Sequence, residues 1–244
     1  MFLKTAKRKA GGLIVLIVIA VLVAGALWYL AGSYPASAEA RSYLSTGEDV
    51  TVSDIENGLF LDGPGTETAL VFYPGGKVEY TSYLPLLYPL AKDGMDVFLL
   101  KMPADLAVFG KDRAGDIMAA HTYDHWYLAG HSLGGAMAAV FAAETEQPPE
   151  GLILLAAYPT KELPDIRVLE LYGSEDRVLN REKLAEGGTY LPADAVVMEI
   201  PGGNHAQFGS YGPQKGDGTA SISASVQQEV TVEMIEDLLY SRPS

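Results

Sequence analysis

The sequence of 244 residues contains no cysteine. Disulfide bonds, thiol catalysis and thiolate metal sites are therefore excluded, and an oxidising compartment would do the chain little harm. Histidine is scarce, with four copies in the whole chain. Only His121 and His125 have the i, i+4 spacing of a metal-binding pair, and they lie just before a predicted strand. We therefore expect neither a metal ion nor another cofactor.

An excess of positive charge is also missing. The chain has 17 lysine and arginine residues against 31 acidic ones, for a net charge of −14. Basic residues gather within the first ten positions, so the remainder is more acidic still. An acidic body repels nucleic acid, and no pattern of a nucleic-acid interface is present. We expect no nucleic-acid partner, and the length and the 48% hydrophobic content suffice for one sizeable core.

A single long apolar run follows the basic start. Leu13 to Leu30 carries no charge and matches the length of about 20 residues that a helix needs to cross a bilayer core of roughly 30 Å. Trp28 and Tyr29 lie at its far end, where an aromatic belt would meet the membrane surface. The positive residues precede the run, so the start of the chain should stay in the cytoplasm. We predict a single-pass signal-anchor over residues 1–32, a linker over 33–48 and an extracytoplasmic body.

Two alternatives to this anchor remain open. A cleaved signal peptide would end at the A-x-A-like site Ala36-Ser37-Ala38 and release a secreted protein that begins at Glu39. The apolar run, however, is longer than the usual hydrophobic region of about 7–15 residues in a signal peptide. The second alternative is a helix buried in the core.

From residue 49 to residue 244 the sequence alternates between strand-like and helix-like segments. Strands are predicted at 50–55, 59–61, 69–73, 97–100, 126–129, 152–156, 168–172 and 195–200, the first two joined as a hairpin by Asn57-Gly58. Helices are predicted at 83–92, 107–120, 135–146, 181–185 and 225–240. Several strands are apolar on both faces, which is typical of a parallel sheet covered by helices on both sides. We predict one α/β domain over residues 49–244 with a mostly parallel sheet.

The motif Gly130-His131-Ser132-Leu133-Gly134 lies between an apolar strand and a helix-forming run. In that context G-x-S-x-G indicates a nucleophile elbow, a sharp turn that holds a serine hydroxyl above the edge of the sheet. The two glycines let the strand and the helix pass closely. The helix that follows directs its N-terminal N–H groups toward a developing oxyanion. Ser132 is therefore the candidate nucleophile.

A serine nucleophile needs a base, and the base needs an anion. In this topology the chain order is serine, acid, histidine. Asp176 follows one predicted strand directly and His205 follows the last, so both should lie at the carboxyl edge of the sheet. Glu175 remains open as a competing acid. For the oxyanion hole we predict the N–H groups of Leu133 and of Gly76 in the turn after strand 69–73, with Lys77 as the alternative to Gly76.

Five segments together resemble the α/β-hydrolase superfamily, and within it the small, capless bacterial branch with a dienelactone-hydrolase-like core. They are Phe72-Tyr73-Pro74-Gly75-Gly76-Lys77-Val78, Lys101-Met102-Pro103, Gly130-His131-Ser132-Leu133-Gly134-Gly135, Gly173-Ser174-Glu175-Asp176 and Gly203-Asn204-His205-Ala206-Gln207-Phe208-Gly209. The resemblance spans roughly residues 50–240 and implies an eight-stranded fold and ester hydrolysis. Two departures stand out. Dienelactone hydrolases use a cysteine nucleophile, which this chain lacks, and Pro74 replaces a histidine often found before the oxyanion glycine.

These observations predict a membrane-anchored serine hydrolase that acts on a small ester or acyl substrate. The segment from Ala157 to Arg167 is too short for a lid domain, so we expect an open site. The polar, glycine-rich loop from Gln207 to Ser221 is long enough for a role near the cleft, or it is an ordinary surface loop. The alternatives in function are an acyltransferase or peptidase with the same triad, and a catalytically silent binding protein of the same fold.

Overall fold

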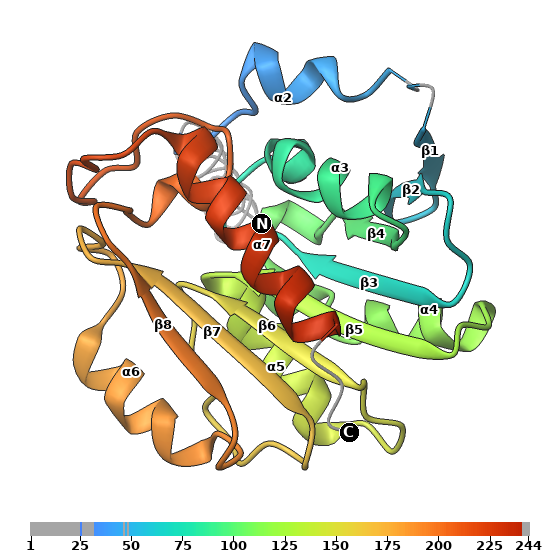
Figure 1. The fold of residues 1–244 in the computed structure, drawn as a ribbon. Coiled ribbons are helices and arrows are strands. Elements are labelled where there is room, and N and C mark those ends of the chain that lie inside the picture. The colour runs from blue at the N-terminus through green and yellow to red at the C-terminus, as the bar shows by residue number, and fades with distance from the viewer. Residues whose placement is uncertain (1–24, 26–31, 46, 48, 241–244) are drawn as a thin grey trace, which may run out of the picture. The chain divides into compact units, whose positions relative to one another are not determined.

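The computed structural model describes residue 25, residues 32–45, residue 47 and residues 49–240 (Figure 1). Residues 34 to 240 of this range belong to one compact unit. The predicted membrane-spanning run from Leu13 to Leu30 lies outside the described residues, apart from Gly25. Within the part of the chain that the structure describes, no helix is long and apolar enough to span a membrane.

The described residues form one sheet of eight strands in the order β1-β2-β4-β3-β5-β6-β7-β8. The strands are β1 Thr51–Ile55, β2 Gly58–Asp62, β3 Thr68–Tyr73, β4 Asp96–Leu100, β5 His125–His131, β6 Gly151–Leu155, β7 Arg167–Gly173 and β8 Val196–Ile200. Strand β2 runs antiparallel to both β1 and β4, and the strands from β4 to β8 are parallel. This arrangement confirms the predicted mostly parallel sheet and the hairpin at residues 57 and 58.

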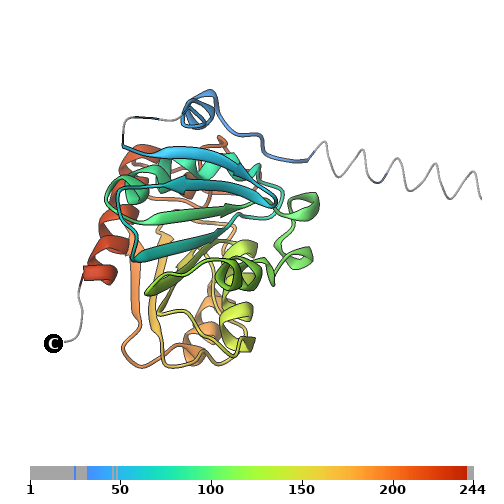
Figure 2. The same ribbon diagram turned by 90° about the vertical axis from the view of Figure 1, so that its right-hand side faces the viewer.

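Helices cover both faces of the sheet (Figures 1 and 2). The α-helices are α2 Ala38–Ser42, α3 Leu84–Lys92, α4 Arg113–Ala120, α5 Leu133–Glu144, α6 Arg181–Gly187 and α7 Ala224–Tyr240. Short 3₁₀ turns are η1 Tyr80–Tyr83, η2 Pro103–Asp105, η3 Ala107–Phe109, η4 Gly188–Tyr190 and η5 Ala206–Phe208. Helices α3 and α7 pack on one face, and α4 and α5 pack on the other.

Strand β3 shows why the parallel strands are apolar throughout. Leu70 and Phe72 point into the core under α3 and α7, whereas Ala69, Val71 and Tyr73 point into the core under α4 and α5. All five side chains are fully buried. A strand covered on both faces loses the alternation of polar and apolar residues that a half-exposed strand keeps.

Two predicted segments differ from the structure. The predicted helix over 107–120 is divided into η3 and α4, because the chain leaves helical geometry at Gly110, with φ −146° and ψ 28°. Glycine has a low helix propensity, so it readily forms such a break. The predicted linker over 33–48 contains helix α2, which Ser37 caps by accepting a hydrogen bond from the Ala40 N–H. Ala40 is fully buried, so the compact domain begins near residue 34 and not near residue 49.

Strand β7 carries a buried carboxyl group. Glu170 on β7 is 2% exposed, and its Oε2 atom has no hydrogen-bond partner among the described residues. Burial disfavours the charged carboxylate and raises the pKa of Glu170 to about 7.

Candidate active site

Strand β5 runs through a sharp turn at Ser132 into helix α5. The backbone of Ser132 has φ 53° and ψ −122°, a conformation that a non-glycine residue rarely adopts. The Ser132 N–H donates to the Leu155 carbonyl at 2.9 Å, which ties the turn to strand β6. Strained backbone of this kind persists only where the surrounding structure fixes it, and it gathers at functional sites. The structure thus has the predicted strand–turn–helix geometry around Ser132.

The glycines on either side of Ser132 make this turn possible. A Cβ atom on Gly130 would lie 2.6 Å from the Gly135 amide nitrogen. A Cβ atom on Gly134 would lie 2.2 Å from the Tyr73 carbonyl oxygen. Both clashes are with backbone atoms that cannot move aside, so these positions require glycine.

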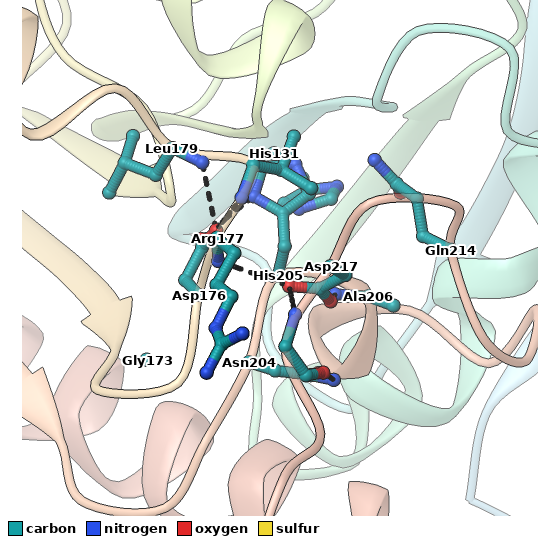
Figure 3. Close-up of polar contacts among 12 residues, drawn as sticks. His131, Gly173, Asp176, Arg177, Leu179, Asn204, His205, Ala206, Gln214 and Asp217 are labelled. Atoms are coloured by element: carbon teal, nitrogen blue, oxygen red, sulfur yellow. Dashed lines mark hydrogen bonds and ion pairs between the residues drawn. The ribbon is translucent and has the colours of Figure 1, made fainter.

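Asp176 and His205 lie together at the carboxyl edge of the sheet, after β7 and β8 (Figure 3). Asp176 Oδ2 and His205 Nδ1 are 2.8 Å apart, and the side chains of both residues are buried. Asp176 Oδ1 accepts hydrogen bonds from the Val178 and Leu179 N–H groups, each at 2.8 Å. The competing acid, Glu175, has no such contact with the histidine; its carboxylate lies 3.4 Å from the Ser174 hydroxyl.

The hydrogen bonds around Asp176 determine its charge. Burial alone would raise its pKa, but the hydrogen bond and the charge interaction with His205, together with the two backbone N–H groups, hold the pKa of Asp176 below its usual value. An ionised carboxylate can only accept hydrogen bonds, so His205 Nδ1 carries the proton that it donates to Asp176. In the neutral form of such an imidazole the other ring nitrogen, Nε2, is an acceptor. It is buried and has no partner within the described structure.

Ser132 and His205 line the same surface cavity. Its remaining walls are mainly apolar and come from α5, from the loop after β6 and from the loop after Asp176. They include Leu133, Ala136, Ala156, Ala157, Tyr158, Thr160, Val178, Leu179 and Asn180. The cavity thus brings the predicted nucleophile and the predicted base to one opening.

The turn after β3 lies beside the start of α5. A Cβ atom on Gly76 would lie 3.1 Å from the Leu133 side chain, so the two residues predicted to form the oxyanion hole are neighbours. The Lys77 N–H donates to the Asp105 carbonyl at 2.8 Å, and the Gly75 N–H donates to the Tyr83 hydroxyl at 3.0 Å. The N–H groups on both sides of Gly76 are therefore engaged, which favours Gly76 over Lys77 as the second donor.

A buried histidine next to the nucleophile joins the elbow to this turn. The Tyr83 hydroxyl accepts from the Gly75 N–H and shares a second hydrogen bond with His131 Nδ1, which lies 2.8 Å away. Burial and the neighbouring His205, whose ring centroid is 4.6 Å away, hold the pKa of His131 well below its usual value. His131 is therefore neutral. The sequence pattern singled out neither His131 nor Tyr83.

The carboxylate of Asp217 contacts the backbone next to both Asp176 and His205. Asp217 Oδ2 accepts from the Ala206 N–H at 2.9 Å, and Asp217 Oδ1 lies 3.3 Å from the Arg177 N–H (Figure 3). Arg177 and Ala206 directly follow the predicted acid and base in the chain. The sequence offered one signal for Asp217, the unusual length of the loop from 207 to 221, but not the residue itself.

The two histidines considered for metal binding lie elsewhere. His121 packs against the ring of Phe98, with centroids 4.9 Å apart, and His125 pairs with Glu150. Among the described residues, no group of three or more histidine, aspartate or glutamate side chains could hold a metal ion.

Comparisons with known proteins agree with this fold. The model of the alpha/beta hydrolase family matches residues 69–229. No curated protein matches the sequence. Among solved structures, a bacterial membrane phospholipase A is 14% identical with a TM-score of 0.60, covering 96% of this chain and 100% of that one. The carboxylesterase CesB of Bacillus subtilis is 12% identical with a TM-score of 0.54, covering 84% and 96%. Est1E of Butyrivibrio proteoclasticus is 15% identical with a TM-score of 0.55, covering 79% and 99%.

Proposed function

Because the chain belongs to the alpha/beta hydrolase family, we propose that it is a serine hydrolase that cleaves carboxylic esters with Ser132, His205 and Asp176. One observation carries the proposal. His205 is oriented by a buried Asp176 and lines the same cavity as Ser132, and its Nε2 atom has no hydrogen-bond partner within the described structure. A base oriented in this way is what a serine hydroxyl needs to become a nucleophile at neutral pH.

The reaction would proceed in two halves. Ser132 Oγ attacks the ester carbonyl carbon while its proton passes to His205 Nε2, and the carbonyl oxygen becomes an oxyanion. The N–H groups of Leu133 and Gly76 would hold this oxyanion. Collapse of the intermediate breaks the bond to the alcohol, which leaves with the proton from His205, and an acyl-serine remains. Water then attacks the acyl-serine and gives a proton to His205, which passes it to Ser132 Oγ as the bond to the acyl group breaks; the acid and free Ser132 are released.

The surroundings of the site favour esters that reach it from an open surface. Residues 156–166 join β6 to β7 directly, and the cavity walls are mainly apolar. Named relatives of the same fold include a carboxylesterase and a phospholipase, both of which act on esters. The lack of cysteine argues against a dienelactone hydrolase in the strict sense.

The proposal includes a location. The uncharged run from Leu13 to Leu30 behind a basic start would anchor the chain in the cell membrane, with the hydrolase domain on the extracytoplasmic side.

The nucleophile can be tested by one substitution. Ser132→Ala should abolish labelling by a fluorophosphonate and reduce kcat on a short p-nitrophenyl ester by about 10³-fold or more, because only binding and oxyanion stabilisation would remain. Ser223→Ala, which changes an exposed serine near the start of α7, serves as the matched control. Full labelling of the Ser132→Ala protein would disprove the assignment.

A further inference from the structure

The described domain begins beside the candidate oxyanion turn. The Tyr34 N–H donates to the Lys77 carbonyl at 2.8 Å, and the Glu79 N–H donates to the Tyr34 carbonyl at 2.9 Å. Tyr34 and Val78 thereby form a parallel bridge. The chain therefore joins the domain at the catalytic edge of the sheet, next to Gly76, and not at the opposite edge.

Exposed apolar side chains lie on the same edge. Val108 and Phe109 in η3 are 45% and 65% exposed, and Phe109 has the highest exposure among the large apolar residues that the structure describes. Their loop adjoins the oxyanion turn: Asp105 accepts from the Lys77 N–H, and Leu106 would be 3.6 Å from a Cβ atom on Gly76. In Figure 2 the loop after β4 projects from the same end of the domain at which its first residues lie.

The length of chain before Tyr34 limits how far this edge can lie from the end of the apolar run. Only Ala31, Gly32 and Ser33 separate Tyr34 from the end of the apolar run at Leu30. Four extended steps span at most about 14 Å. If residues 13–30 cross a membrane, Tyr34, which is hydrogen-bonded to the oxyanion turn, is held within that distance of the end of the span. An exposed aromatic and an aliphatic side chain at such a position would sit favourably at a lipid surface.

We propose that the catalytic edge of the domain faces the bilayer in which the chain is anchored, with Val108 and Phe109 in contact with the lipid surface, and that the substrates are acyl esters of membrane lipids. This inference depends on the proposed hydrolase function and on the proposed anchor. A second apolar group, Val196, Val197 and Met198, lies on β8, the last strand of the sheet and five strands away from β4. That group would point away from the lipid and provides a control.

The test uses the full chain reconstituted in phosphatidylcholine vesicles, after a carbonate wash that removes protein not inserted in the bilayer. Two substrates are compared: a fluorogenic long-chain acyl ester embedded in the same vesicles and a short, water-soluble p-nitrophenyl ester. Val108→Ser with Phe109→Ser should lower the ratio of vesicle-ester to soluble-ester turnover by about tenfold or more, because two apolar contacts with the lipid are lost. Val196→Ser with Val197→Ser should leave the ratio unchanged.

A second variant tests the tether without altering any described side chain. Insertion of about 20 glycine and serine residues between Ser33 and Tyr34 gives the domain a root-mean-square reach of roughly 25 Å from the membrane. The same ratio should fall, while turnover of the soluble ester stays at the wild-type level.

The outcomes separate the two proposals. Loss of both activities in Ser132→Ala, together with an unchanged ratio in the surface and tether variants, would overturn the lipid-facing site and leave the hydrolase function intact. An equal loss on both substrates in the Val108→Ser, Phe109→Ser protein would assign these residues to the site itself and also overturn the inference. Retained activity in Ser132→Ala would instead disprove the hydrolase mechanism.

Discussion

At the scale of single residues, Asp217 is one of the side chains that link the two loops of the proposed triad. Its carboxylate is close to the N–H groups of Arg177 and Ala206, which are separated in sequence from Asp217 by 40 and 11 residues. The same loop fits closely against the acid, since a Cβ atom on Gly218 would lie 1.8 Å from the Glu175 carbonyl oxygen. Asp217 does not touch the reacting atoms, so its role would be to position Asp176 and His205.

Removing this carboxylate should impair the chemical step. We expect Asp217→Ala to lower kcat by roughly 10- to 100-fold with little change in KM, because small displacements of a base carry costs of that size. The kcat of Asp217→Asn should lie between those of the wild type and Asp217→Ala, since its amide keeps one accepting oxygen. The measurement is steady-state kinetics on a soluble ester, together with the pH profile of kcat/KM.

Thr219→Val provides a control within the same loop, because Thr219 is exposed. A rise in KM with kcat unchanged in Asp217→Ala would show that the loop serves substrate binding and not the orientation of the base.

At the scale of elements, the site depends on how η1 joins the turn after β3 to the elbow after β5. Tyr83, the last residue of η1, is fully buried, and its hydroxyl bonds both Gly75 and His131. Tyr83→Phe would leave a backbone N–H and a ring nitrogen unpaired in the interior. We expect a loss of about 1–3 kcal/mol in the free energy of unfolding, and a lower kcat because Gly76 belongs to the freed turn. Denaturant unfolding and ester hydrolysis measure the two effects.

Tyr127→Phe is the matched comparison. Tyr127 is 2% exposed, and its hydroxyl bonds Glu150, just before β6, and Arg167, the first residue of β7. This substitution should also destabilise the fold but leave kcat unchanged. If both variants lose stability and neither loses activity, the contact of Tyr83 is structural only.

The sequence predicts elements well where burial determines composition and poorly where a few local bonds do. β4 and β6 consist almost entirely of apolar residues, and the predicted strands match them to within one residue at either end. Helix α2 has five residues and depends on the cap at Ser37 and on the burial of Ala40, so no periodic pattern reveals it. The proximity of Asp176 and His205 could be predicted because each lies in the loop after a strand that ends at the same edge of the sheet. The contacts of Asp217 could not, because they arise only when a distant loop folds over both.

At the scale of the whole molecule, Glu170 makes stability depend on pH. Its pKa rises from an ordinary value of 4.5 to about 7 in the folded state. Between these values the folded protein holds a proton that the unfolded chain has released, so the free energy of unfolding should fall as pH rises from about 4.5 to 7 and then level off. The full effect is about 3 kcal/mol at 1.36 kcal/mol per pH unit.

Glu170→Gln keeps the shape of the side chain and cannot ionise. We expect it to raise the melting temperature at pH 8 relative to wild type by more than it does at pH 5. Calorimetry at the two pH values measures this difference. An equal shift at both would mean that the wild-type carboxyl ionises with an ordinary pKa.

The position of Tyr34 beside the oxyanion turn would also determine which measure of substrate concentration controls the rate. An enzyme whose Tyr34 is held within about 14 Å of a bilayer meets its substrate by lateral diffusion in two dimensions. The quantity that would govern its rate is the mole fraction of the ester in the membrane. Dilution of the membrane suspension with buffer would leave that mole fraction unchanged. The turnover of each anchored molecule would therefore also stay the same.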